Sequence, residues 1–297
     1  MLDDYDHLTL NSKWDNLTTE LPQMKKLLSE CEEKPLLFID TYSITAEYTE
    51  ALSHYATVIY LGSKRGYLGN LDYQINYCAK TEPEYYKSLY GNKTKLLLGL
   101  KYTPLREEFQ NIKDHTKDRV QRVLITTGNT DAFGYVPMIL NAIIKEDFST
   151  GVLYDVVIGR MFTHQEELES LADQYPSIVL HKNVTRMSDL MKDSDLAITA
   201  AGNTILELAA AKVPQIAFSM VEEQVRSAKE FEELGMIDYA GEIYNDSSIV
   251  IQHIRESLLK MTTSKKDRQN LSEHAASYVD GEGCQRIVTT LMESQID

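Results

Sequence analysis

The chain has 297 residues, of which 43% are hydrophobic and 25% charged, a balance typical of a folded globular protein. Its formal net charge of -15 at pH 7 argues against nonspecific binding to nucleic acid, which needs a basic surface, but allows an anionic small ligand. Because no apolar run approaches the roughly 20 residues of a membrane span, and the acidic start Met1–Asp6 is unlike a signal peptide, we expect a cytoplasmic protein.

The first part of the chain alternates short apolar runs with helical stretches, as in an α/β protein with parallel strands. The expected elements are helices at 17–32 and 46–53 and strands at 35–40, 57–61, 73–76 and 95–99. A doubly wound domain should open with a strand and a phosphate-type turn, whereas this chain opens with polar residues and a helix. We therefore expect an incomplete Rossmann-like domain at residues 1–112, followed by a polar linker that extends to residue 119.

The second part, residues 113–297, is more regular and contains at least five βα units, enough for a complete Rossmann-like domain. Strands are expected at 122–127, 153–159, 177–182, 195–200 and 215–219. Helices are expected at 135–145, 164–174, 187–192, 204–211, 222–234, 248–261, 265–279 and 283–292.

Two loops of the second part are candidate ligand sites, because ligands of open α/β sheets bind beyond the carboxyl ends of the strands. The first loop contains Gly128, Asn129, Thr130 and Asp131, whose small and polar groups fit a phosphate. The alternative is a plain βα turn in which Asn129 or Asp131 caps the following helix. The pattern alone does not decide between the two.

The second loop contains Gly202, Asn203 and Thr204, and Glu207 follows one turn into the next helix. Small residues let a ligand approach the backbone, and free amides at a helix start favour a diphosphate. Glu207 would accept hydrogen bonds from ribose hydroxyls. The alternative is a capping box, in which Glu207 reaches back to a backbone amide of the Thr204 turn.

Two further side chains are candidates for contact with a sugar. Gln224 opens the helix after strand 215–219, and Tyr42 follows strand 35–40. A solvated helix start and a packed tyrosine are the alternatives. Neither the three cysteines nor the seven histidines have metal-site spacing, so we expect neither a metal nor a cofactor.

At these residues the chain resembles a known family. The matching strings are Phe38–Tyr42, Leu97–Phe109 with its LLG-x-x-Y-x-x-LR-x-EF pattern, Thr127–Asp131, and Asp195–Glu207 with its G-x-T-x-x-E pattern. They are similar to the UDP-2,4-diacetamido-2,4,6-trideoxy-β-L-altropyranose hydrolases of pseudaminic acid biosynthesis and to the related spore coat polysaccharide biosynthesis proteins. The resemblance extends from about Trp14 to Ile287 and implies the GT-B arrangement of MurG-like glycosyltransferases.

The resemblance implies a role for each matching loop. Gly202, Asn203 and Thr204 would hold the diphosphate of a UDP-sugar, and Glu207 would hold its ribose. The loop Gly128–Asp131 would line the cleft, and Tyr42 would lie near the sugar. In the family, a histidine in an N-terminal Gly-x-Gly-His motif activates the water that hydrolyses the sugar phosphate.

The chain departs from the family pattern at several places. It has no Gly-x-Gly-His motif, and its one early histidine, His7, has unrelated neighbours. Roughly two βα units of ~30 residues each are absent. The family's Gly-Gly is Gly128-Asn129 here, its paired acids are Gly62-Ser63, and its Asn-Gln is Glu223-Gln224. Either the chain is a truncated enzyme, or it is a degenerate homologue with a weakened or altered site.

Two hypotheses follow. In the first, the chain binds a UDP-sugar as a relative of the hydrolases and glycosyltransferases of surface polysaccharide or nonulosonic acid synthesis, with catalysis in doubt. In the second, it is a non-catalytic interaction subunit, which pairs with an enzyme or with itself through the sheet edge left by the absent strand.

Overall fold

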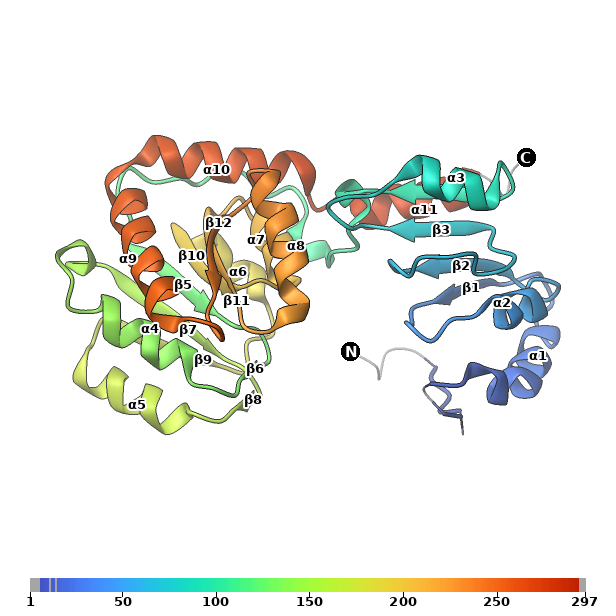
Figure 1. The fold of residues 1–297 in the computed structure, drawn as a ribbon, viewed down its shortest axis with the longest axis horizontal. Coiled ribbons are helices and arrows are strands. Elements are labelled where there is room, and N and C mark those ends of the chain that lie inside the picture. The colour runs from blue at the N-terminus through green and yellow to red at the C-terminus, as the bar shows by residue number, and fades with distance from the viewer. Residues whose placement is uncertain (1–5, 11, 14, 294–297) are drawn as a thin grey trace. The chain divides into compact units, whose positions relative to one another are not determined.

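The computed structural model describes residues 6–10, 12, 13 and 15–293 (Figure 1). Residues 1–5 of the acidic start and Trp14, where the family resemblance begins, lie outside the described residues. The chain forms two compact units, Met1–Tyr102 and Thr103–Asp297. The division expected after residue 112 falls inside the second unit, where Leu105 and Phe109 are buried.

The first unit is a parallel four-stranded sheet with strand order β1-β2-β3-β4 (Figure 1). Its elements are η1 (Leu17–Glu20), α1 (Leu21–Ser29), β1 (Leu36–Ile39), α2 (Ala46–Leu52), β2 (Thr57–Leu61), β3 (Tyr73–Asn76), α3 (Pro83–Tyr90), β4 (Lys95–Leu98) and η2 (Leu100–Tyr102). All four expected strands and the expected helix at 46–53 are present. The helix expected at 17–32 is correct in part, because its first turn is a 3-10 helix that ends before Pro22.

Helix α3 was not predicted. It buries Tyr86 and Tyr90, which lie four residues apart on one face and pack into the same core as Val58 and Tyr60. An apolar face built from tyrosines in a helix of eight residues gives a weak periodic signal, so the sequence does not reveal it.

The strand order of the first unit never reverses, so its described part corresponds to one half of a doubly wound sheet. Among the described residues, β1 pairs with β2 alone, and its outer edge has no partner. Leu36 and Phe38 on this strand are 39% and 50% exposed. Among the described residues, β1 is therefore the edge strand of the first sheet.

The second unit is a parallel six-stranded sheet with strand order β12-β11-β10-β5-β7-β9 (Figure 1). Its strands are β5 (Arg122–Thr126), β7 (Leu153–Ile158), β9 (Ile178–Lys182), β10 (Leu196–Ala200), β11 (Gln215–Ser219) and β12 (Asp238–Glu242). Its helices are η3 (Glu107–Phe109), α4 (Tyr135–Ile143), η4 (Asp147–Ser149), α5 (Gln165–Gln174), α6 (Met187–Asp193), α7 (Thr204–Ala210), α8 (Glu222–Glu233), α9 (Ser247–Thr263), α10 (Lys265–Tyr278) and α11 (Gly283–Glu293).

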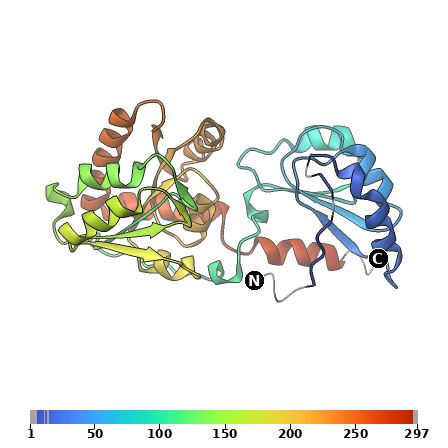
Figure 2. The same ribbon diagram turned by 90° about the horizontal axis from the view of Figure 1, so that it is seen from below.

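Helices cover both faces of this sheet. Successive side chains along a strand point to opposite faces, and in β10 and β11 the side chains on both faces are buried. Helices α4, α5 and α9 share one core cluster with the sheet, which includes Val123, Ile125, Val156 and Ile198. Helix α7 packs against β10 and β11, and α8 packs against β11 and β12. Figure 2 shows the helices and strands of this unit from a second direction. All the helices expected in this part of the chain are present, with ends that differ by at most a few residues.

Three strands of the second unit were not predicted. Strand β12 has the sequence Asp-Tyr-Ala-Gly-Glu and no apolar run, and it forms because it pairs with β11 at the sheet edge. Strands β6 (Thr130–Asp131) and β8 (Met161–Phe162) have two residues each and pair with one another. All three depend on a partner strand, which local sequence does not show.

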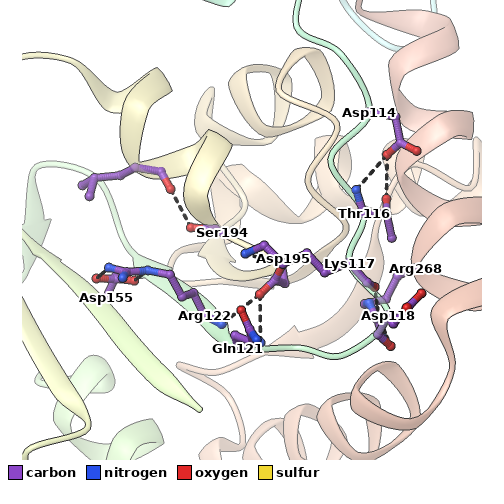
Figure 3. Close-up of polar contacts among 11 residues, drawn as sticks. Asp114, Thr116, Lys117, Asp118, Gln121, Arg122, Asp155, Ser194, Asp195 and Arg268 are labelled. Atoms are coloured by element: carbon purple, nitrogen blue, oxygen red, sulfur yellow. Dashed lines mark hydrogen bonds and ion pairs between the residues drawn. The ribbon is translucent and has the colours of Figure 1, made fainter. Parts of the chain in front are cut away.

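A polar network anchors the segment before β5 to the second unit (Figure 3). Asp195 accepts hydrogen bonds from the amides of Gln121 and Arg122 and lies 3.1 Å from Lys117 Nζ. Arg268 of α10 is fully buried and donates hydrogen bonds to the backbone carbonyls of Lys117 and Asp118 in this segment and of Met261 in α9. These contacts lie at the amino ends of β5 and β10, opposite the carboxyl ends, where ligands of such sheets usually bind.

Candidate functional site

The two loops singled out from the sequence follow β5 and β10, which are neighbours in the sheet. Strand order reverses between them, because the chain proceeds from β5 to β7 and β9 on one side and from β10 to β11 and β12 on the other. The crevice at such a reversal is the usual ligand site of a doubly wound sheet. The fold therefore brings both predicted loops to the place where a ligand is expected.

The loop after β5 is a tight turn built around glycine. Gly128 has a φ of +80°, a left-handed conformation that glycine adopts without strain. The Asn129 carbonyl accepts from the Met161 amide at 2.9 Å, and a Cβ at Gly159 would lie only 2.4 Å from that carbonyl oxygen. Gly128, Asn129 and Thr130 are exposed, so this turn presents polar groups to a ligand on a fixed backbone.

Asp131 is the residue of this loop that caps the next helix. Its side chain is fully buried, and its two carboxylate oxygens accept from the amides of Tyr135 and Val136, both at 2.9 Å. The N-cap residue itself, Gly134, has no side chain to do so. The capping alternative is thus confirmed for Asp131, and a ligand in this loop would meet residues 128–130.

The loop after β10 leaves two backbone amides available. The Gly202 amide donates to the Ala200 carbonyl at 2.8 Å, and the Gly202 carbonyl accepts from the Ile205 amide. For the amides of Asn203 and Thr204 we find no acceptor within the described part of the chain. Unpaired amides at a helix start are suited to bind phosphate oxygens.

Gln224 lies beside this loop. Its side-chain carbonyl accepts from the Met220 amide at 2.8 Å, which orients the amide end of the side chain. Gln224 Nε2 is 4.0 Å from the position that a Cβ would take on Gly202. The fold therefore places Gln224 next to the predicted loop, although residues 212–223, which include strand β11, separate it from Ala211, the C-cap residue of α7.

The capping box expected at Thr204–Glu207 is wrong. The N-cap residue of α7 is Asn203, which makes no side-chain cap hydrogen bond. The carboxylate of Glu207 accepts a hydrogen bond from Arg106 Nη2 at 3.3 Å and reaches no backbone amide among the described residues. Glu207 is therefore not committed to its own helix, since a guanidinium from a distant part of the chain competes for its carboxylate.

Arg106 is shared between two carboxylates. Its Nη2 atom lies 3.1 Å from Glu108 Oε1 and 3.3 Å from Glu207 Oε1. The Glu108 side chain is 8% exposed and the Glu207 side chain 22%. Burial raises the pKa of Glu207, Arg106 opposes this increase, and the negative charge of Glu108 adds to it.

The sequence analysis did not assign a role to Arg106 or Glu108. Both belong to the LR-x-EF string that marks the family resemblance, and they lie about a hundred residues before Glu207. The unusual concentration of charge next to buried Leu105 and Phe109 was the available signal. Their meeting with Glu207 depends on tertiary folding alone.

Tyr42 belongs to the first unit, where it follows β1 and is 82% exposed. The turn that carries it is held by a hydrogen bond from the Ser43 amide to Thr41 Oγ1 at 3.1 Å. The side chain is thus not packed into the core of its own unit, as the structural alternative would require. His7 is exposed as well.

Other features of the described residues do not compete with these loops. A surface cavity of about 740 Å³ lies among α8, α9 and α10 and is lined by Glu232, Asp238, Asp267 and His274, away from the carboxyl ends of β5 and β10. The described side chains contain no group of three or more acidic, histidine or cysteine residues arranged to hold a metal. None of the helices described has the length and apolar character of a membrane span.

Comparisons with known proteins identify relatives of this chain. Residues 139–286 match the glycosyltransferase family 28 C-terminal domain. The chain is 23% identical over 272 residues to the spore coat polysaccharide biosynthesis protein SpsG of Bacillus subtilis, covering 91% of this chain and 72% of SpsG. It is 32% identical over 133 residues to an uncharacterized protein of Methanocaldococcus jannaschii, but this match covers 42% of this chain and only 27% of that relative.

Solved structures show the same fold at low sequence identity. MurG of Acinetobacter baumannii superposes with a TM-score of 0.60 and 14% identity, covering 93% of this chain and 77% of MurG. UGT89C1 of Arabidopsis thaliana, solved with UDP-L-rhamnose, gives a TM-score of 0.57 and 13% identity over 93% of this chain and 76% of its own. The chain therefore has the α/β fold of these structures, is similar to SpsG over most of its length, and matches the glycosyltransferase family 28 C-terminal domain at residues 139–286.

Proposed function

We propose that the second unit binds a UDP-sugar at the carboxyl ends of β5 and β10. The observation that carries this proposal is the reversal of strand order between these two strands, which brings together the two loops that the sequence marks as candidate ligand sites. The match to the glycosyltransferase family 28 C-terminal domain and the likeness to a protein solved with UDP-L-rhamnose support a nucleotide-sugar as the ligand.

Each residue has a distinct part in the proposed site. The amides of Asn203 and Thr204, with Gly202 beside them, bind the diphosphate, since they lack acceptors among the described residues. Glu207 accepts hydrogen bonds from the ribose hydroxyls. Gly128, Asn129 and Thr130 line the crevice, and Gln224 contacts the sugar side of the diphosphate.

The proposal concerns binding and leaves catalysis as a separate question. The given sequence contains no Gly-x-Gly-His motif. The biological role that fits is in the biosynthesis of a surface polysaccharide, since SpsG is named as a spore coat polysaccharide biosynthesis protein. A coupled assay for UDP release from UDP-sugars would show whether the protein also hydrolyses them.

The first test is calorimetric titration with UDP and UDP-N-acetylglucosamine. We expect micromolar binding to the wild-type protein and a loss of at least ~10-fold in Glu207→Ala, because two hydroxyls lose a charged acceptor. The wild-type protein should bind the 2′-deoxy analogue dUDP more weakly than UDP. The Glu207→Ala variant should bind the two nucleotides with the same weak affinity.

The matched control is Glu256→Ala, which removes an exposed glutamate of α9 away from the crevice and should leave UDP affinity unchanged. Absence of any heat from the folded wild-type protein with both nucleotides would rule out the proposal. Equal binding of UDP and dUDP would show that Glu207 does not hold the ribose.

A second candidate function is self-association through β1. The observation that favours it is the unpaired outer edge of this strand among the described residues, with Leu36 and Phe38 exposed beside it. An unpaired strand edge is a template for pairing with a second copy. This function does not exclude nucleotide binding, since β1 belongs to the first unit and the proposed crevice to the second.

A further inference from the structure

The carboxylate of Glu207 is held from one side only. Its Oε1 atom faces Arg106, whereas its Oε2 atom makes no hydrogen bond with any residue that the structure describes. The side chain as a whole is 22% exposed. One oxygen is thus anchored to the protein while the other is left to accept from a ligand.

Arg106 is itself fixed by three neighbours. Besides Glu207 it contacts the buried carboxylate of Glu108, and its guanidinium carbon lies 5.5 Å from the centre of the Phe109 ring. Phe109 is fully buried in the second unit. These contacts place the cation between the two carboxylates, although the Arg106 side chain is 40% exposed.

Arg106 is the cation that offsets the negative charges of Glu108 and Glu207. Two carboxylates with little solvent exposure face one cation, so removal of that cation would leave two like charges close together in a poorly solvated place. The pKa of Glu207 would then rise further, because the cation that opposes the effects of burial and of the Glu108 charge would be gone. A protonated Glu207 would have lost much of its strength as an acceptor for hydroxyl groups.

Among the described residues, no second cationic side chain lies beside Glu207 to take the place of Arg106. Helix α10 packs against α7 and carries the buried Arg268, but the Arg268 guanidinium is committed to the carbonyls of Met261, Lys117 and Asp118. Within the described part of the chain, Arg106 and Glu108 are the charged groups that act on Glu207.

We propose that Arg106 is a positioning residue of the nucleotide site, which keeps Glu207 ionised and directs its free oxygen toward the ribose, with Glu108 as the anchor that orients Arg106. This inference rests on the proposed function, because it takes the ribose of a UDP-sugar as the group that Glu207 receives. It assigns a role in recognition to the LR-x-EF string, which lies outside the loops of the crevice.

The test has two independent readouts. The first is the titration of the Glu207 carboxyl carbon by NMR in the ligand-free protein with 13C-labelled glutamate, assigned with Glu207→Gln. In Arg106→Gln the titration of Glu207 should move to higher pH by about one unit or more, because an opposite charge within ~4–6 Å is lost. In Glu108→Gln it should move to lower pH, because a like charge is lost.

The second readout is the affinity for UDP between pH 5.5 and 8.5. Arg106→Gln should bind UDP roughly 10-fold more weakly at pH 7, and the loss should grow as the pH falls and Glu207 becomes protonated. Arg106→Lys should restore part of the affinity, since it keeps the charge but not the fork of the guanidinium. A merely structural role would weaken binding equally at every pH.

The control is Arg255→Gln, which removes an arginine of similar exposure that pairs with Glu146 on the same unit. It should change neither readout. An unchanged Glu207 titration in both Arg106→Gln and Glu108→Gln would overturn the inference whatever the affinity for UDP. If the Glu207 titration shifts in these variants but the wild-type protein does not bind UDP, the proposed function is refuted and the ion-pair arrangement is still supported.

Discussion

Arg268 on α10 is fully buried, which is rare for a charged side chain and requires partners for its donors. It finds them in backbone carbonyls rather than in a carboxylate, and burial lowers its pKa although nearby Asp195 and Asp118 oppose this. Its Nε atom makes no hydrogen bond. The residue therefore stabilises the protein by connecting the segment before β5 to the C-terminal helices (Figure 3).

Replacement of Arg268 by alanine should destabilise the second unit by about 3 kcal/mol, because a cavity forms and three carbonyls lose their donor. Urea unfolding monitored by circular dichroism would measure this change. Arg255→Ala removes a half-exposed surface pair and should cost less than ~1 kcal/mol. If both variants cost the same, the buried guanidinium does not hold the segment.

Glu207 and Asp131 show that two carboxylates in the same unit can have different roles. Both are carboxylates just after a strand of the second unit, and both have a capping alternative in the sequence. Asp131 is fully buried with both oxygens bound to backbone amides, whereas Glu207 keeps one oxygen without a hydrogen bond to the described residues. The difference decides which of the two is able to meet a ligand.

At the scale of elements, the start of α4 depends on Asp131 because its N-cap residue is Gly134. Asp131→Ala should therefore cost about 2 kcal/mol, since two helix amides lose a charged acceptor in a buried place. Asp131→Asn should cost less, because its amide oxygen still accepts one of the two bonds. Thermal unfolding at pH 7 would rank the variants.

The comparison variant for this element is Asn129→Ala. Asn129 is exposed, and its side chain accepts one long hydrogen bond of 3.3 Å from the Arg160 amide, so its loss should change stability by less than ~0.5 kcal/mol. A cost for Asn129→Ala as large as that for Asp131→Ala would show that the turn, and not the cap, supports the helix.

At the scale of the whole molecule, the outer edge of β1 sets the state of association. If it pairs with a second copy, light scattering after size exclusion should give twice the chain mass of 33.9 kDa as concentration rises into the tens of micromolar. Phe38→Lys should restore the monomer, because charge on an edge strand prevents pairing. Leu27→Lys, on exposed α1, is the matched control and should not. A wild-type monomer at all concentrations would exclude this role.

The sequence predicted most of the regular elements because their apolar residues repeat with the period of a helix or a strand. Strands β2, β3 and β11 were predicted to the residue. Helix α3 and strand β12 were missed, since a tyrosine face and a polar edge strand lack that repeat. The division between the units lay ten residues from the expected one (112 against 102), because residues 103–112 pack with the second unit.

By itself the sequence determined the α/β class, the two loops of the proposed site and the family resemblance, all of which depend on neighbours along the chain. Only the tertiary structure decided that these loops flank the reversal of strand order, that Asp131 caps a helix, and that Arg106 and Glu108 face Glu207. The physical reason is distance along the chain: an ion pair between residues 106 and 207 depends on the packing of the intervening sheet, and no local pattern records it.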